Sequence, residues 1–354
     1  MDDELPLLPD GYSFVVDNNG AYLVDPTGAY VVQRTAGAPT AISPDEQMAQ
    51  PEAIWYVPET TLGVMPQHST DWRTLRFTGE SLMPRYDTDQ SAEITASRTR
   101  GDVAQVAANV DGDIGIELSA GQLDEFMEAA LCGTWDGDAL KVGTLRRSFT
   151  FAKFFADFST TDRYDIYNGL SVGQLTLTFR YGSLAEGSIS LLGLDAWSDT
   201  ATPIGTGSVA PPSNTAVFSG ASDVISIAVD GLTGIYVDEL TLTLGASVRA
   251  KTALGHKFPF ALGFGSAVVD GSFRAYFEDR NTENKVRSGA PFSLRFTIGD
   301  AANRYTFDIP RAFHTSRDGL AASAMDSDVM PTYSFSSAFD ETSGSPVTIT
   351  RVAG

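Results

Sequence analysis

The pattern of apolar and polar positions between Gly112 and Phe155 predicts a strand, a helix and a second strand. Residues 113–118 alternate polar and apolar side chains, as a half-buried strand does. Residues 145–155 are expected to return as a long strand. One short amphipathic helix in a chain otherwise rich in strand signals indicates a mainly β (α+β) fold, with a helix packed on a β-sandwich.

The predicted helix has a recognisable beginning, face and end. Ser119 precedes Gln122 by three residues, the spacing of a capping box. Gly133 can end the helix in a left-handed conformation. Apolar residues at helical spacing form one face, which we expect to pack on the core: Leu123, Phe126, Met127, Ala130 and Leu131.

Strand signals surround this stretch on both sides. Before it, residues 93–98 and 103–110 read as a long hairpin with a turn at Gly101-Asp102, preceded by a strand at 75–77. After it, residues 174–181 and 188–192 form another predicted pair. Further strands are predicted at 224–229, 240–244, 271–277, 292–298, 305–309, 333–339 and 347–351.

The order of these strands suggests two similar domains in one chain. The stretch Asp270-Gly271-Ser272-Phe273, followed by polar residues 281–289 and a strand, parallels Asp111-Gly112-Asp113-Ile114 with its helix and strand. We expect a first domain at 56–200, a linker or long loop at 201–222 and a second domain at 223–354. The alternative is that antiparallel β-proteins align by chance, and residues 281–289 show no obvious amphipathic helix.

Residues 1–55 read as an N-terminal appendage or arm. Two near-copies, at 19–26 and 27–32, each contain Gly-Ala-Tyr followed by two aliphatic residues. They predict two short strands joined by a Pro-Thr-Gly turn. A two-stranded hairpin is marginal alone, so we expect it to lean on a neighbour.

Composition narrows the class of protein. The 354 residues suffice for two core-bearing domains, and 42% hydrophobic residues is ordinary for a globular protein. The formal net charge of −21 disfavours a nucleic-acid-binding protein, because phosphates would be repelled. No apolar run approaches the roughly 18 residues of a membrane helix, and the acidic N-terminus is unlike a secretory signal. The single cysteine, Cys132, excludes an intrachain disulfide and fits a reducing cytoplasm.

The search for catalytic chemistry is negative. The three histidines, His68, His256 and His314, are far apart in sequence, and no His or Cys spacing matches a metal site. Gly79-Glu80-Ser81 lacks the second glycine of a nucleophile elbow. We therefore expect no enzyme activity, no catalytic residues, no cofactor and no metal.

An ordered set of weak motifs resembles a known family. The set runs from Val57-Pro58-Glu59-Thr60-Thr61-Leu62-Gly63 through Trp72, Thr78-Gly79-Glu80-Ser81-Leu82 and the 112–131 stretch to Phe307-Asp308-Ile309-Pro310-Arg311. In order and spacing it is similar to the tail tube (major tail) proteins of long-tailed, non-contractile bacteriophages, the siphophage tail tube family. The resemblance covers roughly residues 55–354.

This resemblance implies a structural subunit of a phage tail tube, located in the virion tail and assembled in the host cytoplasm. Its β-sandwich would contribute long hairpins to a continuous barrel around a lumen. Stacked rings would conduct double-stranded DNA without binding it specifically. Partners would be further copies of the chain and other tail proteins, with no membrane. Candidate lumen residues are the polar alternates of two hairpins: Glu93, Thr95, Ser97 and Asp102, and Thr241, Thr243 and Asp270.

Two questions stay open at this stage. Three two-domain chains would form a pseudo-hexameric ring, whereas six single-domain chains would form a true hexamer. The alternative function is a carbohydrate-binding or fibre-type β-sandwich of a virion or extracellular protein. Such a module usually presents an aromatic platform, but the four tryptophans are scattered singly.

Overall fold

The computed structural model of the chain describes residues 12–14, 32–34, 53–66, 69–94, 101–156, 163–230, 232–233, 236–276, 280–318 and 328–352. Contacts divide the chain into a small unit, residues 1–50 with 157–161, and a body, residues 51–156 with 162–354. In the small unit, β1 (Tyr12–Phe14) pairs antiparallel with β2 (Val32–Arg34). Of the two Gly-Ala-Tyr copies, only Val32 is among the described residues, so the predicted turn between them lies outside the described part of the chain. Of the arm at 33–52, only residues 33 and 34 are described.

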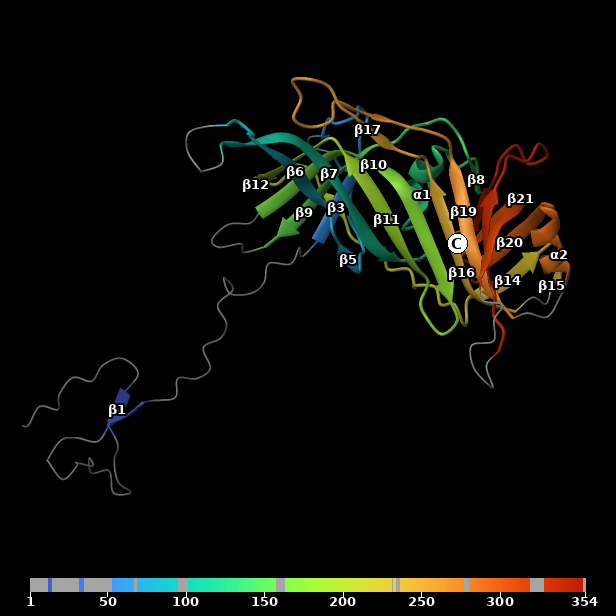
Figure 1. Cartoon of the computed structure of the whole chain (residues 1–354). Coiled ribbons are helices and arrows are strands. Elements are labelled where there is room, and N and C mark those ends of the chain that lie inside the picture. The colour runs from blue at the N-terminus through green and yellow to red at the C-terminus, as the bar shows by residue number, and fades with distance from the viewer. Residues whose placement is uncertain are drawn as a thin grey trace, which may run out of the picture. The chain divides into compact units, whose positions relative to one another are not determined.

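The body is built mainly of strands, which confirms the predicted fold class (Figure 1). The first half of the body contains β3 (Ala53–Pro58), β4 (Trp72–Leu75), β5 (Gly79–Glu80), β6 (Met83–Gln90), β7 (Val103–Glu117), α1 (Asp124–Leu131), β8 (Ala139–Lys141), β9 (Phe149–Phe155), β10 (Arg163–Arg180), β11 (Glu186–Gly193) and β12 (Asp195–Asp199). After β13 (Val209–Ala210), the second half contains β14 (Val224–Val229), β15 (Leu232–Thr233), β16 (Val237–Gly245), β17 (Arg249–Lys251), β18 (Ala261–Gly263), β19 (Val268–Ala275), α2 (Arg280–Ser288), β20 (Phe292–Gly299), β21 (Arg304–Asp318), β22 (Thr332–Ser337) and β23 (Thr348–Val352).

One antiparallel sheet of eight strands runs through both halves, in the order β6-β7-β11-β10-β16-β19-β22-β21. Behind it lie two back sheets. The first-half back sheet has the order β4-β3-β9-β10-β12, and the second-half back sheet has the order β14-β20-β21-β23. The long strands β10 and β21 belong to both layers, the first part of each to a back sheet and the last part to the eight-stranded sheet. The described pairings leave β6 and the end of β21 as edges, so the sheet does not close into a barrel within the chain.

The two halves repeat the same pairing scheme. The strands β7, β9, β10, β11 and β12 pair among themselves as β19, β20, β21, β22 and β23 do. The register of β10 shifts between Tyr167 and Leu170 opposite β9, and between Val172 and Gln174 opposite β11. That of β21 shifts 142 positions later in both cases, at 309–312 opposite β20 and at 314–316 opposite β22. A bulge is a specific feature of a strand. The matching bulges are therefore stronger evidence that the two halves are alike than the order of their strands is.

The helices also occupy matching places, α1 after β7 and α2 after β19. Residues 281–289 show no obvious amphipathic helix in the sequence, so α2 was not predicted, and that expectation was wrong. Val286 is the single apolar residue of this segment, and it packs partly buried against the core. A hydrophobic-period search does not detect such a helix.

The predicted helix is present, but it begins later than expected. It starts at Asp124 with Leu123 as N-cap and no side-chain capping bond. Ser119 instead forms an isolated bridge with Val217, and its hydroxyl donates to Gln122 Oε1 at 2.9 Å. The capping box was therefore a wrong reading of a strand end. At the other end, Cys132 takes the left-handed conformation that was predicted for Gly133.

Two strand predictions were also wrong in their bounds. The first strand of the long hairpin is β6 at 83–90; of the predicted strand 93–98, residues 93–94 form no strand and residues 95–98 lie outside the described residues. The strand expected to begin at 145 begins at Phe149, and a short strand that was not predicted, β8, precedes it and pairs with β23 of the second half. Six consecutive residues of β6 from Arg85 are exposed, so apolar and polar positions show no clear period of two in this strand.

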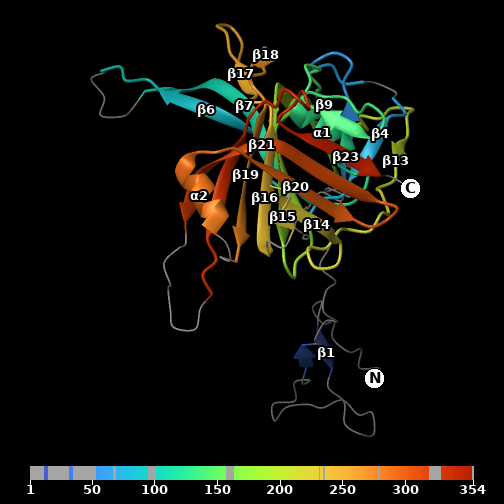
Figure 2. The same ribbon diagram turned by 90° about the vertical axis from the view of Figure 1, so that its right-hand side faces the viewer.

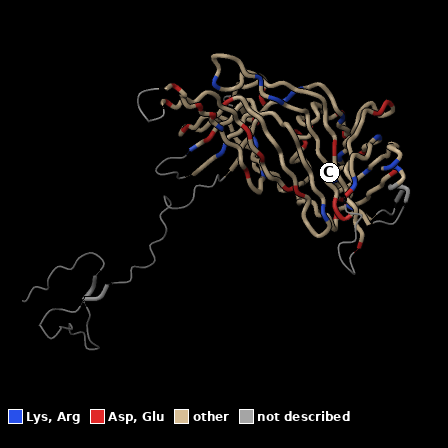
Figure 3. Tube along the Cα trace, viewed as in Figure 1, with Lys and Arg blue, Asp and Glu red and all other residues tan. Residues whose placement is uncertain are grey.

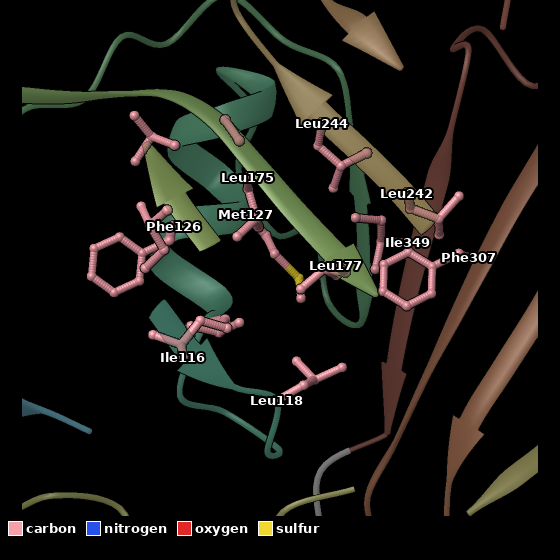
Figure 4. Packing of buried hydrophobic residues seen from close by; sticks show 14 of the residues in the cluster. Ile116, Leu118, Phe126, Met127, Leu175, Leu177, Leu242, Leu244, Phe307 and Ile349 are labelled. Carbon is pink, nitrogen blue, oxygen red and sulfur yellow. The ribbon is translucent and has the colours of Figure 1, made fainter. Parts of the chain in front are cut away.

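The core lies between the layers and contains α1 (Figure 4). The five residues of the predicted helix face, together with Ala129, are almost completely buried. The Phe126 ring lies 4.9 Å from that of Tyr56 and 5.4 Å from that of Phe149. Met127 points toward Leu177 of β10 (Figure 4), and α1 also contacts β16, so the helix supports strands of both halves.

The segment 201–222 is ordered against the first half. Its strand β13 pairs in parallel with β4, and the Arg76 guanidinium donates to the carbonyls of Ser213 and Thr215 at 2.9 and 2.8 Å. Neither of the two helices in the described body has the length and apolar character needed to cross a membrane.

Candidate functional site: the polar face of the eight-stranded sheet

The eight-stranded sheet has one apolar and one polar face. In β10, Leu175, Leu177 and Phe179 are buried against the core, whereas Thr176 and Thr178 point to the opposite side. The same alternation holds in the other central strands. It follows from the period of two in a strand, so the sequence itself sets which side chains gather on each face.

The polar side chains align in rows across the strands. The pairing register gives one row of Glu117, Glu186, Thr178, Thr241, Ser272 and Ser334, and a second of Gly115, Ser188, Thr176, Thr243, Asp270 and Ser336. Each row crosses from the first half to the second where β10 pairs with β16. Short hydroxyl and carboxylate side chains therefore form one continuous surface over both halves.

The charge of this surface is acidic, and three of its arginines are paired with carboxylates. Of the basic residues on the described strands of this sheet, Arg85, Arg180 and Arg274 are paired with carboxylates, and β21 adds Arg311 and Arg317. Arg85 pairs with Asp111 at 2.6 Å and Arg180 with Glu239 at 2.7 Å, while Arg274 pairs with Asp238. Figure 3 marks acidic and basic positions along the trace. The remaining acidic residues, including Asp113, leave the face net negative.

The structure brings together three of the seven candidate lumen residues. Thr241, Thr243 and Asp270 are neighbours in the rows, with Thr243 directly opposite Asp270. Glu93 and Asp102 are exposed and lie beyond the paired strands of the β6–β7 hairpin, away from these rows. Thr95 and Ser97 lie outside the described residues.

Several residues of this face were not singled out from the sequence. Thr176, Thr178, Ser188, Ser272 and Ser334 lie in the rows beside the predicted three. The alternation Leu-Thr-Leu-Thr-Phe in residues 175–179 carried the signal. The sequence pattern did not indicate that β10 pairs with β16, which places strands of the two halves on one sheet.

A family model described as a phage tail tube protein matches residues 49–337 of the chain. The chain belongs to the phage tail tube protein family. A comparison with curated proteins returned no match. This tail tube protein is accordingly a structural component of the virion tail, as the resemblance at residues 55–354 predicted.

The contact between the two halves of the tail tube protein is made by α1 as well as by the sheet. Asp124 accepts a hydrogen bond from the Tyr305 hydroxyl at 2.5 Å and forms an ion pair with Arg351. The Arg351 guanidinium also lies 4.4 Å from the centre of the Trp135 ring. Burial, with the nearby Asp124 carboxylate, raises the pKa of Tyr305, so this phenol stays protonated and donates.

Among the described residues, no three His, Cys, Asp or Glu side chains are arranged to hold a metal ion. His256 lies near the Phe260 ring, and His314 stacks on Phe292 at 4.1 Å between ring centres. His68 lies outside the described residues. The side chains that the polar face presents are mainly hydroxyls and carboxylates, with a few arginines.

Proposed function

We propose that this chain polymerises into stacked rings whose lumen is lined by the polar face of the eight-stranded sheet and conducts double-stranded DNA. The observation that carries this proposal is the continuity of the hydroxyl and carboxylate rows across both halves. The opposite face of the sheet is occupied by the core, so the polar face is the one available to line a channel.

We further propose that the halves are two tube domains, 56–200 and 223–354, and that three chains form a pseudo-hexameric ring. The repeated pairing scheme and matching bulges support this. Three chains with eight strands each would give 24 strands, more than the roughly 16–18 that already leave an aqueous channel in a barrel. Joining the β6 edge of one chain to the β21 edge of the next would remove both exposed edges, which are an aggregation hazard in a monomer.

The charge of the face suits passage of DNA without binding. Affinity for DNA comes largely from Lys and Arg that neutralise phosphates and release counterions. Arg85, Arg180 and Arg274 on this face are paired with carboxylates, and the further acids of the face would repel the phosphates. Assembly in the host cytoplasm and contacts with other tail proteins at the tube ends belong to the same proposal.

Electron microscopy of the purified full chain at increasing concentration tests this function. Tubes with a central channel are the expected result. Particles that stay monomeric under all conditions would contradict it and would favour the carbohydrate-binding or fibre-type module.

A further inference from the structure

Inside the chain, the first half inserts α1 and the end of β10 into a recess of the second half. The Phe179 ring of β10 lies 4.6 Å from that of Phe296, and Asp124 of α1 binds the Tyr305 hydroxyl. Met127 points into the same region from α1 (Figure 4). The recess is apolar and no more than 1% exposed at Leu240, Leu242, Phe296, Tyr305, Phe307 and Ile349.

The pairing register identifies the matching positions in the first half. Phe307 lies opposite Phe296 and Ile349, and in the same places Asp165 lies opposite Lys153 and Ser198. Extending this correspondence along the strands gives Glu80, Leu82, Lys153, Arg163, Asp165 and Ser198 as counterparts of the six recess residues. All six line one cavity of about 380 Å³ beside β6. The first half thus has an open pocket where the second half is filled by α1.

The pocket differs from the recess in its chemistry. Lys153 pairs with Glu80 at 2.5 Å and donates to the Leu82 carbonyl at 2.5 Å, and Arg163 pairs with Asp165 at 2.9 Å. The residues at the matching positions of the recess are apolar or aromatic. A recess filled within one chain never has to face water, whereas a surface between separately folded copies does before assembly. Polar lining is typical of interfaces whose partners are stable alone.

We propose that this pocket receives helix α2 and the end of β21 from the neighbouring copy of the chain. This proposal rests on the proposed function, in which the chains form a ring, and it specifies the surfaces through which neighbouring chains contact each other. Helix α2 contacts β21 as α1 contacts β10. Helix α1 also contacts β16, the strand of the second half that pairs with β10. The counterpart of β16 is β6, which lies at the other edge of the eight-stranded sheet, so the strand completing the α2 contact comes from a second copy.

The exposed surface around both elements fits this partner. Asn284 and Ser288 of α2 are exposed, and the last turn of α2 is basic, with Lys285 and Arg287. On the pocket side, Met83 and Tyr86 of β6 are 49% and 46% exposed. Figure 2 shows the β6–β7 hairpin projecting from the body, with α2 beside the end of β21. Covering these apolar side chains is a favourable contribution that a lone chain lacks.

Cysteine cross-linking in assembled protein tests the contact. The variant Asn284→Cys places a thiol on α2, and Ser198→Cys places one at the pocket. The two single variants are mixed, assembled, and treated with a short bis-maleimide linker. The matched controls are each single variant alone and the unmodified chain, all of which retain the buried Cys132.

The expected result is at least about tenfold more covalent dimer in the mixture than in any control, because thiols held side by side react at a high effective concentration. A chain carrying both substitutions should link up to closed covalent trimers. Rings that assemble without this excess would overturn the inference and leave the tube function standing. Absence of any ring or tube in the unmodified chain would overturn the proposed function, and the inference with it.

Discussion

At the scale of single residues, Phe126 shows how the core holds the helix between the sheets. The side chain is fully buried against the rings of Tyr56, Phe149 and Phe151. Phe126→Ala should lower the free energy of unfolding by about 3–5 kcal/mol, the range for a large buried aromatic residue. Urea denaturation measures the change, with Phe339→Ala as control, because Phe339 is 58% exposed. Equal stability of the two variants would show that the helix face is not part of the core.

His314 gives the protein a titratable group in a packed environment. It takes the place in β21 that the buried Val172 has in β10. Burial lowers the pKa of His314 to about 4, opposed by Asp230 and assisted by Lys285. The unfolded chain protonates this histidine near pH 6.5, so between about 6.5 and 4 the unfolded state binds more protons. Stability contributed by the neutral ring is therefore present above pH 6.5 and lost as the pH falls toward 4.

We accordingly expect His314→Val to lose less stability than the parent chain between pH 7 and pH 5. Denaturation midpoints at the two pH values measure this. His256→Val, at an exposed position, serves as control and should behave as the parent does. Parallel losses in all three proteins would assign the acid sensitivity to other groups.

At the scale of elements, two glycines allow the hairpins of the eight-stranded sheet to pack closely. A Cβ at Gly112 would lie 2.4 Å from Leu82 Cα, and one at Gly271, its counterpart, 2.4 Å from the Thr241 carbonyl oxygen. Gly112→Ala should therefore destabilise the protein by about 1–3 kcal/mol through overpacking. Gly79→Ala, on the same sheet with open space around it, should change stability by less than about 0.5 kcal/mol. Thermal denaturation distinguishes them, and indistinguishable midpoints would contradict the close approach.

The elements also show how far the sequence determined the fold. A strand with clear alternation, β20, was predicted to within one residue: residues 292–298 were expected and Phe292–Gly299 is observed. Elements failed where periodicity is weak: β6, whose side chains are nearly all exposed, and α2, which has almost no apolar stripe. Three lumen candidates lie on the polar face because the alternation of polar and apolar residues within a hairpin can be read from the local sequence. The rest of that face depends on the β10–β16 pairing, which joins residues 59 to 71 positions apart and leaves no local signal.

At the scale of the whole molecule, the polar face predicts how DNA and tube interact. Thr176→Arg with Thr243→Arg would place unpaired basic groups opposite each other across the seam of the two halves. Assembled tubes of this variant should retain short duplex DNA at low salt and release it as salt rises. Fluorescence anisotropy measures retention, with Ser222→Arg on an exposed turn as control. Equal retention by the control would show that the polar face is not the DNA path.

The central claim is that one chain carries two tube domains and turns a single polar sheet face toward the lumen. Cryo-electron microscopy of the assembled tube tests it most directly. The account predicts three chains per ring, six similar but unequal domains around the axis, and the Thr178–Thr241 and Thr176–Thr243 pairs at the inner wall. A ring of six chains, or one whose inner wall is formed by the back sheets, would contradict it.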